Sequence, residues 1–273
     1  MTKFVRYMAI TIALALMTFA GIQLGTYLYQ SVEENAVNDE LSALADSPFE
    51  EGEVWAGDGD EERWYTWEDP DVQAKTKVQS YSQRLFGKAA PGKMPTGGKQ
   101  TKTSITNAQK RKINFTALKK KNKDIVAWIS IPNTPIDYAV LKTGNNSYYL
   151  KRNAIKKPSS SGAIFLDSAA KADFSSKDSI VYGHRMKDRT MFGSLISYKN
   201  SKHRKSHQYV FVYTPKATKK YRVSECFRTS SKKLTPKNAK VRTLSLVTCD
   251  DAKGKVHYIV RAKLVSSKKP GKK

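Results

Sequence analysis

Acidic residues are scarce over most of this sequence. Residues 73–273 contain 46 Lys and Arg but only 9 Asp and Glu, whereas residues 32–72 hold 15 of the chain's 24 acids beside a single base, Arg63. The larger part of the chain is therefore a polycation. Such a charge suits nucleic acid, anionic lipid or an acidic wall polymer, and charge alone does not choose among them.

Cysteine is also scarce, and Cys226 and Cys249 are the only two. One bridge would be a thin disulfide framework for an exported domain, and a lone reactive thiol is at least as consistent with the count. The His, Cys, Asp and Glu residues show no metal-ligand spacing. The sequence therefore predicts neither a metal nor another cofactor.

Charge is absent altogether from Tyr7 to Tyr29, a run rich in Ala, Ile, Leu and Met. A helix of that length spans a bilayer core of about 30 Å. Because Lys3 and Arg6 precede the run, the positive-inside rule predicts a single-pass protein of the cell membrane with a cytoplasmic N-terminus. A cleaved signal peptide is the alternative, although its apolar core has about 7–15 residues and no clear cleavage site follows here. Either way the bulk of the chain is exported, which argues against a nucleic-acid partner.

The chain divides by composition into three regions. Residues 1–31 are the cytoplasmic start and the transmembrane anchor, and residues 32–113 form a linker that is first acidic and then basic. Neither half of the linker has enough apolar residues to bury a core. Residues 114–273 are the folded domain with a short basic tail.

Within this domain, short apolar runs recur between turn residues and predict eight strands. These are 125–131, 136–141, 162–167, 179–183, 208–214, 220–228, 241–249 and 256–265. Short helices are predicted at 115–122, with Asn114 as the cap, at 146–151 and at 191–198. The predicted fold is mainly β, a closed barrel or sandwich with few helices.

Two strands end in residues that carry chemistry. His184 follows the β-branched strand 179–183, and Cys249 is the last residue of the apolar strand 241–249. Cys226, by contrast, lies in the middle of its strand, as a core cysteine does. A thiol attacks as the thiolate, and a neighbouring imidazolium lowers its pKa and then protonates a leaving amine. The pair therefore predicts acyl transfer, with Cys249 as the nucleophile and His184 as the acid/base.

These motifs resemble those of the sortases. The resemblance rests on YGHRM followed by MFGSL, and on LVTCD near the end of the chain; WISIPNT, IDYAVLK and NNSYYL are similar to the opening of the class B branch. It covers roughly residues 114–265. It implies an eight-stranded barrel and a transpeptidase that cleaves an Asn-Pro-x-Thr-x-like sorting signal after Thr through a Cys thioester. The partners implied are exported proteins with a C-terminal sorting signal and an amine of a peptidoglycan precursor.

The resemblance also implies a substrate groove. Tyr182, Asn146 and Leu150 match positions that line the sorting-signal groove in class B enzymes. The alternative for each is purely structural: an edge aromatic, a turn Asn and a core Leu.

The arginine that sortases place after the Cys is the main departure from the pattern. His257 occupies that position, and Arg261 follows four residues later. If the loop 250–256 closes symmetrically, Cys249 faces His257 and Arg261 lies two pairs further along the same face. Arg261 is favoured as the oxyanion donor because it is always charged and planar, with His257 or Arg185 as alternatives.

Two further functions fit the same residues. One is polymerisation of pilin subunits, in which a Lys side chain is the accepting amine. The other is a non-enzymatic basic domain that binds the wall or the membrane surface. Asp250 and Asp251 are secondary candidates for orienting His184.

Overall fold

The computed structural model describes residues 3–49, 105–230, 234, 240–249 and 255–269. All of them belong to one compact unit, formed by residues 1–54 and 97–270. Asp250 and Asp251 lie outside the described residues.

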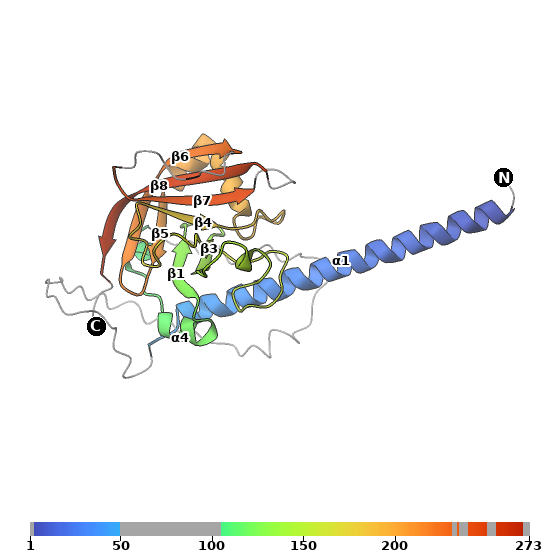
Figure 1. Ribbon diagram of the computed structural model, residues 1–273, viewed down its shortest axis with the longest axis horizontal. Coiled ribbons are helices and arrows are strands. Elements are labelled where there is room, and N and C mark those ends of the chain that lie inside the picture. The colour runs from blue at the N-terminus through green and yellow to red at the C-terminus, as the bar shows by residue number, and fades with distance from the viewer. Residues whose placement is uncertain (1–2, 50–104, 231–233, 235–239, 250–254, 270–273) are drawn as a thin grey trace. The chain divides into compact units, whose positions relative to one another are not determined.

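Eight strands close into a barrel in the order β1-β2-β3-β4-β7-β8-β6-β5, and Figure 1 shows β6, β8 and β7 side by side. Most neighbours are antiparallel, but β2–β3 and β4–β7 are parallel. The strands are β1 Ile125–Ser130, β2 Asp137–Leu141, β3 Phe165–Leu166, β4 Asp178–Tyr182, β5 Tyr209–Tyr213, β6 Thr218–Thr229, β7 Thr243–Cys249 and β8 His257–Lys268.

The eight predicted strands and the barrel are confirmed, and β3 is the one that differs most in length. Its first residues leave the ladder because Gly162 has a left-handed backbone, with φ of 60°. The next residue, Ala163, donates its N–H to Tyr149 O at 2.9 Å instead of to a strand. Residues 162–164 therefore lead into β3 outside the strand, although Ile164 O still accepts a hydrogen bond from Leu141 N of β2 at 3.0 Å.

Alternation along the strands gives the barrel two different faces. On β7, Leu244 and Leu246 are fully buried in the main core, whereas Val247 packs with Ile180 and Ile259 in a separate small cluster. Cys249 shares the Val247 face because the two residues are two positions apart. The thiol therefore lies on the outer face of the barrel.

The short helices follow their predicted positions. Helix α4 (Phe115–Lys121) is capped by Asn114, whose side chain accepts from Ala117 N at 3.0 Å. The other two predicted helices are 3-10 turns, η1 (Tyr148–Leu150) and η2 (Gly193–Lys199). Helices α3 (Ile105–Lys110) and α5 (Ser201–Ser206) were not predicted.

The N-terminal helix α1 runs from Lys3 to Ala45 and has two distinct parts. The apolar side chains that the structure describes between Tyr7 and Val32 are exposed, whereas Val37, Leu41 and Ala45 are buried. These three residues are four apart, so they form one stripe, and this stripe contacts the domain. Among the described residues, α1 is the one helix long and apolar enough to cross a membrane.

The second part of α1 is held to the domain by opposite charges. Glu33 pairs with Lys157 (3.1 Å), and Glu40 pairs with Lys121 (2.6 Å). Just past the helix end, Asp46 pairs with Arg111 at 2.7 Å. Asn114 N also donates to Ala45 O at 2.8 Å, and Figure 1 shows α4 beside this end of α1. The beginning of the acidic region 32–72 is thus a helix docked on the basic domain.

Candidate active site

The parallel pairing of β4 with β7 brings the two predicted catalytic residues to the same edge of the barrel. Tyr182 pairs with Val247, and Gly183 N donates to Val247 O at 3.1 Å. His184 and Cys249 are each two residues beyond this pair. Because parallel strands run in step, with neighbours about 4.8 Å apart, the two residues emerge side by side and on the same face.

The His184 ring is fixed by its surroundings. Its Nε2 donates to the carbonyl oxygen of Leu150 at 2.8 Å, and its own carbonyl accepts from Phe192 N at 3.0 Å. A carbonyl only accepts, so Nε2 carries a proton and Nδ1 is left for proton exchange. Gly183 permits this arrangement, since a Cβ there would lie 2.4 Å from Ile164 Cδ1 and 2.8 Å from the Phe192 ring.

The two cysteines are both half-buried, but they lie in different surroundings. Both belong to the described part of the chain, and neither forms a disulfide. Cys226 packs against the main core, and burial raises the pKa of its thiol. Cys249 is half-buried at the end of β7, on the same face as His184.

The register of the β7–β8 hairpin is the one expected for a symmetric loop. Cys249 pairs with His257, whereas Arg261 pairs with Ser245. Side chains of paired residues share a face, so His257 lies beside the thiol. Ser245 is four residues before Cys249, which places Arg261 about 13 Å along the strand from the thiol.

Arg261 is buried and its guanidinium is already occupied. It is 6% exposed, Nη2 donates to Leu234 O at 2.6 Å, and Nε donates to Ser245 Oγ at 3.1 Å. Nη1 lies 3.4 Å from a Glu225 carboxylate oxygen, and the group stacks over Phe227. In this structure Arg261 therefore binds Leu234 on the outer face of the barrel.

His257 has an unused polar atom. Its side chain is half-buried, and within the part of the chain that the structure describes its Nδ1 has no hydrogen-bond partner. A buried polar atom without a partner costs free energy, so such an atom beside the Cys249 thiol is suited to binding a ligand.

Two of the predicted groove residues meet at a third that the sequence did not single out. Asp167 Oδ2 accepts from Tyr182 Oη at 3.0 Å and from Asn146 Nδ2 at 2.8 Å. Burial and the Asp167 charge raise the pKa of Tyr182, and Phe165 stacks on its ring. The available signal for Asp167 was its position, since it is the polar residue that ends the predicted strand 162–167.

Leu150, the third predicted groove residue, lies next to the imidazole through its backbone. Its side chain is 38% exposed, so it is not the core Leu of the alternative interpretation. No group of three potential metal ligands occurs among the described residues.

Comparisons with known proteins agree with this geometry. A sequence model of the sortase domain matches residues 129–265, half of the chain. The chain is 43% identical over 81 residues to sortase B of Listeria monocytogenes, a match covering 30% of this chain and 33% of the relative. It is 30% identical over 118 residues to sortase B of Staphylococcus aureus, covering 43% of this chain and 48% of the relative. The matched segments thus span less than half the length of these relatives.

A solved structure gives a similar result for the fold. Sortase B from B. anthracis superposes with a TM-score of 0.51 at 28% identity, over 57% of this chain and 85% of that one.

The site predicts that the two thiols differ in reactivity. Because the pKa of Cys226 is raised by burial, its thiolate fraction at pH 7–8 is smaller than that of an ordinary cysteine. We expect iodoacetamide to label Cys249 at least about tenfold faster, as measured by peptide mapping over time. Faster labelling of Cys226 than of Cys249 would contradict this assignment.

Proposed function

Because this chain belongs to the sortase family, in its class B branch, we propose that it is a membrane-anchored cysteine transpeptidase acting on exported proteins. Its substrate is a C-terminal sorting signal similar to Asn-Pro-x-Thr-x, cleaved after Thr. The acceptor is an amine of a cell-wall precursor. The proposal is carried by the β4–β7 register. His184, two residues past the end of β4, and Cys249, the last residue of β7, are expected at one edge of the barrel because of this register.

In the first half of the reaction, Cys249 Sγ attacks the carbonyl carbon of the Thr residue. The tetrahedral intermediate collapses to a thioester, and the C–N bond to the following residue breaks. His184 gives a proton to the leaving amine, which departs neutral. In the second half, the acceptor amine attacks the thioester, His184 takes a proton from it, and the Cys249 thiolate leaves.

The hydrogen bond from His184 to Leu150 O supports these roles. It holds the ring at the edge of the barrel and keeps the proton on Nε2, so Nδ1 is the nitrogen that exchanges a proton with the substrate amine. The carbonyl oxygen also stabilises the imidazolium, the form that pairs with the thiolate.

The oxyanion of the tetrahedral intermediate needs a donor within about 3 Å. We assign this role to His257 because it is the register partner of Cys249 and has a buried nitrogen without a partner among the described residues. Arg261, which sequence reasoning favoured, is paired further along the strand and bound to Leu234 O and Ser245. A pair of imidazoles beside one thiol then replaces the imidazole and guanidinium that sortases use.

The sorting signal would lie along the outer face between Leu150 and Tyr182. Asp167 fixes the Tyr182 hydroxyl and the Asn146 amide on one side, and Leu150 offers an apolar contact on the other. This combination suits a short peptide with one apolar and one amide-bearing residue. The groove residues therefore act in binding, separate from the reacting pair.

Residues 7–29 would anchor the protein as a single span, with the N-terminus in the cytoplasm and the catalytic domain outside. The apolar side chains of this part of α1 are exposed, as lipid-facing side chains are. The polycationic domain would then be retained at acidic wall polymers. Division of the chain at residues 31 and 113 is part of the same proposal.

Cleavage of a labelled Asn-Pro-x-Thr-x peptide tests the reaction. We expect Cys249→Ala and His184→Ala each to lower kcat/KM by at least about a thousandfold, because each removes a reacting group. Both variants should still bind acidic wall polymer as the wild type does, which controls for folding. Cleavage at the normal rate by the Cys249 variant would rule out Cys249 as the nucleophile and, with it, the proposed thioester mechanism.

Comparison of His257→Ala with Arg261→Ala tests the oxyanion assignment. Loss of His257 should lower kcat by about 10²–10³-fold with little change in Tm. Loss of Arg261 should lower stability by about 2–4 kcal/mol, since it leaves buried hydrogen-bonding groups without their charged partner, with kcat of the folded protein largely retained. The reverse pattern, an inactive but stable Arg261 variant, would return the role to Arg261.

A further inference from the structure

The juxtamembrane part of α1 contacts a loop next to the catalytic histidine. Glu34 Oε1 accepts hydrogen bonds from Ser159 Oγ and from the backbone N–H of Ser161, the latter at 3.4 Å. One turn earlier, Gln30 accepts from Ser160 Oγ at 3.2 Å, and Glu33 pairs with Lys157. Two successive turns of the helix therefore bind one loop, residues 157–162, through hydrogen bonds and an ion pair.

This loop ends against His184. Ser159 Oγ accepts from Gly162 N at 3.0 Å, so the same hydroxyl links Glu34 to Gly162. Gly162 is packed so closely that a Cβ there would lie 2.9 Å from Leu150 O and 3.0 Å from His184 Cδ2. Leu150 O is the acceptor of the His184 ring. Two hydrogen bonds thus connect the Glu34 carboxylate to Gly162, which leaves no room for a Cβ beside Leu150 O and the imidazole.

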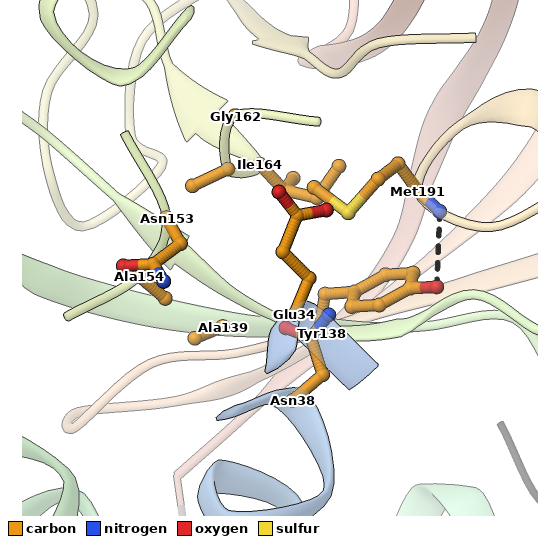
Figure 2. A pocket seen from close by; sticks show the side chains of 10 residues that line it. Glu34, Asn38, Tyr138, Ala139, Asn153, Ala154, Gly162, Ile164 and Met191 are labelled. Atoms are coloured by element: carbon orange, nitrogen blue, oxygen red, sulfur yellow. Dashed lines mark hydrogen bonds between the residues drawn. The ribbon is translucent and has the colours of Figure 1, made fainter. Parts of the chain in front are cut away.

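A cavity with room for about one water molecule is lined by Glu34 and by Met191, which precedes the second residue that binds His184, Phe192. Figure 2 shows the Glu34 side chain reaching into it between Ile164 and Met191. Met191 N donates to Tyr138 Oη at 3.0 Å, and the next residue, Phe192, donates to His184 O. The cavity is therefore bounded by both segments that hold the histidine.

We propose that Glu34 is a positioning residue for His184, so that the juxtamembrane turn of α1 is part of the catalytic apparatus. The proposal rests on the function proposed above. The bond that the Glu34 carboxylate accepts from the Ser159 hydroxyl is charge-assisted, and such bonds are shorter and stronger than neutral ones. Without it the loop loses its anchor, Gly162 moves from Leu150 O, and the ring loses its fixed orientation. Misplacement of a reacting group by about 1 Å costs about 10²-fold in rate.

A matched pair of variants in the full-length protein in detergent micelles separates positioning from docking. Glu34→Ala removes the link to the loop. Glu40 lies on the same helix as Glu34, and Glu40→Ala removes its ion pair to Lys121 of α4. We expect Glu34→Ala to lower kcat for the Asn-Pro-x-Thr-x peptide by about 10–100-fold with KM within about twofold. Glu40→Ala should leave kcat within about twofold of the wild type. Unchanged kcat in the Glu34 variant, or equal losses in both, would overturn the proposal.

A second pair covers the case in which Glu34→Ala does not fold. Ser159→Ala removes the hydroxyl between Glu34 and Gly162, whereas Ser160→Ala removes the neighbouring hydroxyl that contacts Gln30. Only the Ser159 change should lower kcat, and Ser159→Thr should restore most of it because the hydroxyl is retained. Equal kcat for the two alanine variants would contradict the positioning role.

The labelling rate of Cys249 gives a readout that does not depend on the peptide. In a Cys226→Ser background at pH 7, His184→Ala first establishes how much the imidazole accelerates alkylation. Glu34→Ala should move the rate most of the way to the His184→Ala value, and Glu40→Ala should not. If His184→Ala itself has no effect, the proposed thiol–imidazole pair fails. If His184→Ala slows labelling and Glu34→Ala does not, only the positioning role fails.

Discussion

The backbone pairing of β4 with β7 is the constraint on which the site depends. Five consecutive residue pairs, ending at Tyr182 and Val247, hold the two strands in step. Because the strands are parallel, both run toward the same edge of the barrel, where Cys249 is the last residue of β7 and His184 lies two residues past the end of β4. A shift of one residue would turn Cys249 into the barrel and leave His184 without a partner. The packed faces prevent that shift, since Leu244 and Leu246 are buried on one side and Val247 on the other.

Local sequence patterns were sufficient for the strands and for the β7–β8 hairpin. Short apolar runs between turn residues located all eight strands, and a symmetric loop gave the pairing of Cys249 with His257. The parallel pairing of β4 with β7 was not predictable in this way because it joins Ser179 to Leu244, far apart in the chain and linked by no turn signal. The resemblance to a family, and not the pattern, supplied that link. Asp167 was overlooked for the same reason, since its partners Asn146 and Tyr182 come from different segments.

Charge also explains how the first part of the acidic region is attached to the domain. The first residues of the acidic region, up to Ala45, continue the apolar run as one helix, and Glu33 and Glu40 pair with Lys157 and Lys121 on the domain. Asp46, just past the helix, pairs with Arg111. The buried stripe Val37, Leu41 and Ala45 is too short to be recognised against a polar background. Opposite charges and this stripe together connect the apolar helix directly to the domain.

Identification of the covalent intermediate tests the central claim most directly. The full-length protein is incubated with the Asn-Pro-x-Thr-x peptide without an acceptor amine, quenched in acid and analysed by intact mass and peptide mapping. The account predicts an adduct equal in mass to the peptide acyl group through Thr, located on Cys249 and absent from His184→Ala. An adduct on another residue, or turnover without any adduct that an added amine can discharge, would contradict it.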